Sequence, residues 1–152
     1  MSKQIAFILK IGTLVSTAGF VGSMLIQVYA RFFMSSAPSW TEEASRFFFL
    51  YAMGFASGLA MRDGYYVHLD VFYAKMKDSH KRLLDISIPI MVMILFLILG
   101  TYAVQYVILG IPEGSPSLGM SMSIAFTSLI VMSLSVSVFA FYELKTILKK
   151  KL

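Results

Sequence analysis

The chain has 152 residues, of which 58% are hydrophobic and 14% charged, and its formal net charge is +5. Soluble globular domains carry about 25% charged residues, because polar surface must cover their core. This composition excludes an ordinary soluble enzyme, a disordered tail and a nucleic-acid-binding domain, so we expect no nucleic acid partner. The chain has no cysteine, which excludes disulfides, thiolate zinc sites and iron–sulfur clusters.

Charged residues leave four long gaps along the chain, at 11–30, 47–61, 86–112 and 114–142. A membrane-spanning helix needs about 20 mostly apolar residues, and the first, third and fourth gaps meet this length alone. The sequence therefore predicts an all-α membrane protein, with four tilted transmembrane helices in one domain covering residues 1–152. The approximate spans are 11–33, 39–62, 79–110 and 116–143.

The second gap is too short to span by itself, because its residues reach only about 22 Å against a hydrocarbon core of about 30 Å. Directly upstream, the motif S-W-T-E at 39–42 fits a capping box at the start of a helix. We therefore expect a helix over 39–62. It carries Glu42, Glu43 and Arg46 in its first two turns, at or just inside the membrane interface.

Charged side chains gather beside Trp40 at this end of the second span. On one helix, Arg46 can reach both Glu42 and Glu43, which precede it by four and three residues. Arg31 ends the first span, and a short loop should return it close to one of these acids. Charges in a partly dry interface must pair. The cluster can anchor the helix, fix the angle between the first two spans, or form a docking surface, and these roles are compatible.

Small residues recur along the second span. Gly54 and Gly58 form a G-x-x-x-G pair, and Ala52, Ala56 and Ala60 repeat at every fourth position. In lipid, small residues let another helix approach closely. The pattern leaves two alternatives open, packing within the four helices and packing against a partner subunit.

The third and fourth spans carry their own signals. Pro89 lies inside the third span, where the missing amide and the ring should kink the helix. The fourth span is rich in serine, whose hydroxyls can bond to backbone carbonyls or across helices.

Basic residues sort to one side of the four spans. The two termini and the second loop share a side, which has eleven of the thirteen Lys and Arg residues. On the other side, only Arg31 and Arg46 flank the first loop. The positive-inside rule then places both termini in the cytoplasm. A cleaved signal peptide ending at 28–30 is the rival interpretation, but its apolar run of about 20 residues exceeds the 7–15 typical of such peptides. We expect the first span to be retained.

The second loop has an amphipathic pattern of its own. Leu69, Phe72, Tyr73 and Met76 share one helical face, while charged residues lie off it. The pattern predicts a short interfacial helix at about 67–77, lying against lipid on the cytoplasmic side.

Nothing in the sequence supports catalysis or a resident cofactor. Neither histidine lies in one of the charge-free stretches of the spans, so a bis-histidine haem within the membrane has no ligands and a redox anchor is disfavoured. No carboxylate lies deep in a span, where proton-driven transporters commonly place one. There is no P-loop and no Rossmann glycine motif. We expect no enzyme, and no metal or cofactor on this chain.

A set of motifs runs from residue 27 to residue 70. It comprises Gln27 and the following V-Y-A-R-F-F, W-T-E-E-A-S-R at 40–46, Gly54, Arg62-Asp63-Gly64 and Asp70. These motifs resemble the small (Q-type) integral membrane subunit of the tripartite ATP-independent periplasmic (TRAP) transporters. Ser117-Leu118-Gly119 also resembles that family's third loop. One position departs, because the family commonly has a histidine two residues after the glycine of Arg-x-Gly, where this chain has Tyr66 and places His68 two residues later.

The resemblance implies a division of labour in a bacterial inner membrane. A large membrane subunit would carry the substrate and sodium sites, a periplasmic binding protein would deliver the substrate, and this chain would be a static scaffold in contact with lipid. The implied activity is sodium-coupled uptake of organic acids of the sialic acid or C4-dicarboxylate type. The alternative is a self-sufficient four-helix transporter acting as a homodimer, a class that typically relies on a carboxylate in its first span. The first span here has none.

Overall fold

Four long helices make up most of the computed structural model, which describes residues 2–34, 38–63 and 78–149. They are α1 (Ser2–Phe33), α2 (Ser39–Arg62), α4 (Asp78–Leu109) and α5 (Ser123–Lys149). All four are long and apolar enough to cross a membrane. The prediction of an all-α membrane protein with four spanning helices is confirmed. The interfacial helix expected at 67–77 lies outside the described residues.

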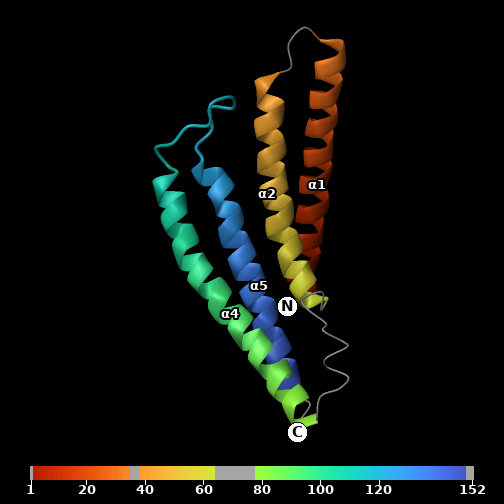
Figure 1. Ribbon diagram of the computed structural model, residues 1–152, viewed down its shortest axis with the longest axis vertical. Helices are drawn as coiled ribbons and strands as arrows, with labels where there is room; N and C mark the ends of the chain where they lie inside the picture. The colour runs from red at the N-terminus through yellow and green to blue at the C-terminus, as the bar shows by residue number, and fades with distance from the viewer. Residues whose placement is uncertain (1, 35–37, 64–77, 150–152) are drawn as a thin grey trace.

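The helices pack in the order α1–α2–α5–α4, since α1 contacts α2, α2 contacts α5, and α5 contacts α4. Figure 1 shows two antiparallel pairs that converge towards the end carrying both termini and diverge towards the opposite end. Only 6% of the most apolar stretch of α4 is buried, against 44% of that of α5. The row therefore leaves broad apolar faces, above all on α4, for lipid or another protein to cover.

Apolar side chains from all four helices meet near the chain termini. Buried residues from α1, α2 and α5 form the centre of this core, and side chains of α4 pack against it. The members named by burial are Ala6, Leu9, Met61, Val136, Phe139 and Ala140, with Val92, Met93 and Phe96 of α4 beside them. This core holds the converging end of the row together.

The glycine pair of α2 faces α5 of the same chain. A Cβ atom placed on Gly54 would lie 2.8 Å from the carbonyl oxygen of Ser128, and one on Gly58 would lie 2.6 Å from the Cβ of Ser135. Both distances are below those that carbon atoms tolerate, so only glycine permits this approach. We call this contact the α2–α5 seam. The alanines at 52, 56 and 60 are half-buried.

Serines on α5 supply the small surface that meets these glycines. The Ser128 hydroxyl donates to Ala125 O at 2.6 Å, and the Ser135 hydroxyl donates to Met132 O at 3.1 Å. Because these hydroxyls are satisfied within their own helix, the serines act in the seam mainly as small residues. In the described part of the chain, the buried hydroxyls of Ser133 and Ser137 have no hydrogen-bond partner.

The start of α2 differs from the capping box that its sequence suggested. Pro38, in an extended conformation, occupies the N-cap, and no side chain caps the helix there. Thr41 is fully buried and its hydroxyl donates to Pro38 O at 2.8 Å instead. Proline presets the extended entry to the helix, so Ser39 becomes the first helical residue rather than the cap.

The later helices also add detail to the predicted layout. Pro89 lies inside α4, which continues as one helix on both sides of it, and the kink expected there stays a prediction. α5 begins at Ser123, later than the span start at 116 expected from charge alone, because the residues before it fold into a turn.

Replacing Gly54 by alanine tests the α2–α5 seam. We expect Gly54→Ala to lower the free energy of unfolding by about 1–3 kcal/mol, because the new methyl group meets backbone that must move. Thermal unfolding of the purified full chain in detergent, followed by circular dichroism, measures this.

Gly22→Ala is the matched control, because a Cβ on Gly22 of α1 would meet nothing within 4 Å. Alanine favours a helix over glycine by about 1 kcal/mol, so this variant should melt no lower than the parent. Equal melting of the two variants would contradict the seam.

Candidate interaction site at the diverging end

The connection between α4 and α5, residues 110–122, folds back on itself at the diverging end of the row. An isolated antiparallel bridge joins Gly114 to Ser121. The backbone N–H of Gly119 donates to Ser115 O at 3.1 Å. Gly119 has a φ of +64°, which glycine adopts without strain. We call residues 110–122 the α4–α5 loop.

Glu43, in the first turns of α2, holds this loop. Its Oε2 atom accepts the backbone N–H groups of Ser117 and Leu118, both at 2.9 Å. A carboxylate that accepts two amides forms a charge-assisted pair of hydrogen bonds. The contact joins two motifs far apart in the sequence and ties the start of α2 to the other helix pair.

The other charges of the predicted cluster separate. Glu42 pairs with Arg46 on the same helix, and both side chains are largely exposed, so the pair adds little stability where water reaches it. Among the described residues, Arg31 forms an ion pair with neither acid. The expected nearness of Arg31 and Glu42 appears instead as a shared pocket.

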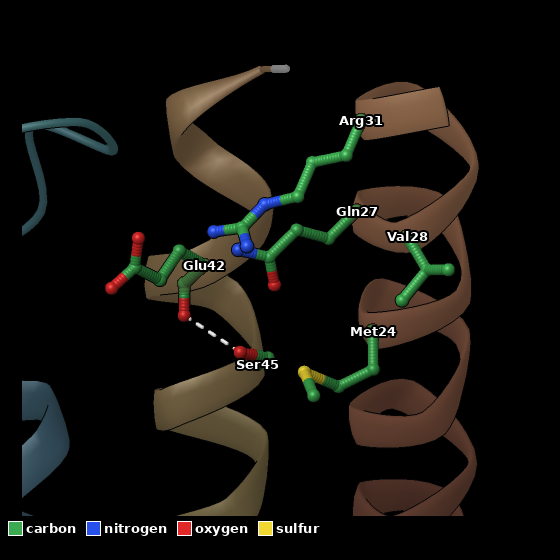
Figure 2. A pocket seen from close by; sticks show the side chains of 6 residues that line it. All are labelled: Met24, Gln27, Val28, Arg31, Glu42 and Ser45. Carbon is green, nitrogen blue, oxygen red and sulfur yellow. Dashed lines mark hydrogen bonds between the residues drawn. The ribbon is translucent and has the colours of Figure 1, made fainter. Parts of the chain in front are cut away.

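This pocket lies between α1 and α2 and has a volume of about 330 Å³. It is lined by Met24, Gln27, Val28, Arg31, Glu42 and Ser45. Figure 2 shows the side chains of Gln27 and Arg31 reaching from α1 towards α2. The Glu42 carboxylate points away from α1, while its backbone oxygen accepts the Ser45 hydroxyl at 2.7 Å. The pocket therefore presents polar donors without a facing carboxylate.

Exposed aromatic side chains surround the same end. Tyr29 and Phe33 stack with their ring centroids 4.8 Å apart. Phe32 is 81% exposed and Trp40 is 43% exposed. Aromatic residues collect at membrane–water interfaces, and these side chains have that character. The charge pattern had singled out Trp40 alone, although the run at 29–33 carries the same signal.

A polar contact also crosses the α2–α5 seam. The Tyr51 hydroxyl donates to Ile124 O at 2.7 Å and forms a further hydrogen bond with the Thr127 hydroxyl. The sequence analysis did not identify Tyr51. A tyrosine within a span could have indicated it, because its hydroxyl needs a hydrogen-bond partner when it is away from water.

The remaining motif residues lie at or beyond the opposite end of α2. Arg62 pairs with Asp63 at 3.6 Å, and both side chains are half-exposed. Gly64 and Asp70 lie outside the described residues, as do Tyr66 and His68. Among the residues that the structure does describe, no group of three or more His, Cys, Asp or Glu side chains could hold a metal ion.

The chain is similar to a known protein family and to a named relative. Residues 20–150 match the family model described as tripartite ATP-independent periplasmic transporters, DctQ component. A Haemophilus influenzae protein provisionally named a TRAP transporter small permease protein is 24% identical over 105 residues, covering 69% of this chain and 64% of that relative. The chain thus spans slightly less than two thirds of the length of this relative.

Removing the Glu43 carboxylate tests its hold on the α4–α5 loop. In Glu43→Ala, we expect amide hydrogen exchange at Ser117 and Leu118 to accelerate by about tenfold or more, because both N–H groups lose a charge-assisted acceptor. Hydrogen-exchange mass spectrometry of the full chain in detergent measures the change.

Glu42→Ala serves as the control, since it breaks only the exposed pair with Arg46 and should leave both loop amides as protected as in the parent. Unchanged exchange in Glu43→Ala, or equal acceleration in both variants, would show that Glu43 does not hold the loop.

Proposed function

Since this chain belongs to the tripartite ATP-independent periplasmic transporters, as a DctQ component, we propose that it is a static scaffold for the large membrane subunit of such a system. Membership of the family confirms the resemblance found in the motifs between residues 27 and 70. It makes the chain a small permease subunit and a multi-pass protein of the bacterial inner membrane.

The packing of the helices supports a fixed rather than a moving part. In the α2–α5 seam, Gly54 and Gly58 lie in close contact with α5, and such close packing favours a stable association of the two helices. Glu43 adds a second tie between the two helix pairs at the diverging end. The largely unburied α4 offers a long apolar face against which another membrane protein can pack.

The transport chemistry belongs, in this proposal, to the partners. The large subunit binds sodium and the substrate, and a periplasmic binding protein delivers an organic acid of the sialic acid or C4-dicarboxylate type. The charge asymmetry of the sequence favours a cytoplasmic location for both termini. Glu43 and the α4–α5 loop would then face the periplasm, the side from which the binding protein arrives.

The alternative of a self-sufficient homodimeric transporter has less support. A transporter of that class needs an ionisable group within the membrane to couple its motion to an ion. The charge-free stretch at 11–30 contains no such group. The chain is therefore better suited to hold a transporting subunit than to transport.

Reconstitution into liposomes tests the proposal. The chain alone, the large subunit alone, and the two together are each supplied with the binding protein, a radiolabelled organic acid and an inward sodium gradient. We expect uptake only from the combined subunits. In the proposal the large subunit carries the ion and substrate sites, and this chain holds the large subunit in its working position.

A sodium-free gradient of potassium is the control for coupling, and equal incorporation of each subunit is checked on gels. Uptake by the lone chain would overturn the scaffold role. Full uptake by the large subunit alone would show that it needs no scaffold.

A further inference from the structure

Arg31 carries a charge that the described protein does not neutralise. It lies in the last turns of α1, and no ion pair joins it to any described acid. Glu42, which lines the same pocket, pairs with Arg46 and turns its carboxylate away from α1. A guanidinium at the edge of a membrane is costly unless an anion or water meets it. Arg31 is exposed in the described chain, so water can reach it, and its side chain reaches into a pocket that has room for an anion from outside the chain.

The pocket is polar near the end of α1 and apolar towards the middle of that helix. Arg31 and Gln27 lie one helical turn apart and both reach into it (Figure 2). Met24 precedes Arg31 by seven residues and so lies about 10 Å closer to the middle of the helix. Met24 and Val28 form an apolar wall there. This order, cationic donors above apolar carbon, matches a phosphate group above the start of an acyl chain.

The position of the pocket along the helices supports the same ligand. Tyr29 and Phe33 flank Arg31 in the last turns of α1 and are exposed, as is Trp40 on α2. Aromatic residues of this kind mark the headgroup level of a bilayer, where lipid phosphates lie. The planar guanidinium suits a phosphate, because its donors can engage two oxygens together.

We propose that the pocket between α1 and α2 binds the headgroup phosphate of a membrane phospholipid, through Arg31 and Gln27, with the upper acyl chain against Met24 and Val28. The lipid fills the space between the two helices and neutralises Arg31. This site requires only that the chain lie in a membrane, and does not depend on the scaffold role.

Native mass spectrometry of the full chain tests the site. The probes are dioleoylphosphatidylglycerol, dioleoylglycerol, which lacks the phosphate, and inorganic phosphate. Phosphatidylglycerol should remain bound to the parent chain at least about tenfold more than dioleoylglycerol. Retention should fall about tenfold in Arg31→Gln, which keeps the length and removes the charge.

Two further variants keep the test decisive. Arg62→Gln removes an arginine at the opposite end of α2 and should retain the lipid as the parent does. Met24→Trp leaves Arg31 intact but fills the apolar part of the pocket, and should also lower retention. Circular dichroism confirms that each variant is helical, and Met24→Trp carries the test should Arg31→Gln not fold.

Several results would overturn the proposal. If Arg31→Gln retained as much phosphatidylglycerol as the parent, the Arg31 charge would not bind the lipid. If the parent retained as much dioleoylglycerol as phosphatidylglycerol, the phosphate would not be recognised. Competition by inorganic phosphate as strong as that of the lipid would indicate a site for a free anion. If the large subunit displaced the lipid, and Arg31→Gln loosened that complex, the pocket would instead accept an acidic side chain of the partner.

Discussion

The close approach of α2 to α5 is the contact on which the rest of the structure depends. In the packing order α1–α2–α5–α4, it joins one antiparallel pair of helices to the other. Lipid is as apolar as the side chains that it would replace, so helices in a membrane associate through close van der Waals contact rather than through burial from water. Gly54 and Gly58 provide that contact, because neither has room for a Cβ beside α5.

The features at the diverging end follow from this seam. With α2 held against α5, Glu43 is within reach of the amides of Ser117 and Leu118, and Tyr51 is within reach of Ile124. The α4–α5 loop is thereby attached to the start of α2. On the other side of α2, the first helix leaves a pocket into which Arg31 turns. The close seam and the attached loop are the two contacts that support the proposed scaffold role.

The sequence predicted the helices better than their partners. Gaps between charges identified four spans, since a charge inside lipid is costly. The residues from 116 onwards are also uncharged, so this criterion could not distinguish the turn before Ser123 from the helix that follows it. The glycine spacing predicted a close helix approach without indicating which helix approaches. Glu43 binds backbone amides more than 70 residues away. Nearly every residue has a backbone N–H group, so the sequence does not indicate which of them a carboxylate will bind. Arg31 was expected to meet an acid from proximity alone, whereas rotamers direct Glu42 to Arg46.

A double-mutant cycle across Gly58 and Ser135 tests the seam most directly. A Cβ on Gly58 would lie 2.6 Å from the Cβ of Ser135, so Gly58→Ala alone should lower the free energy of unfolding by about 1–3 kcal/mol. Ser135→Gly removes the obstructing side chain. If the seam governs the fold, the double variant should recover about 1 kcal/mol or more relative to the sum of the single effects. Strictly additive effects would contradict the account, because they would mean that these two positions do not touch.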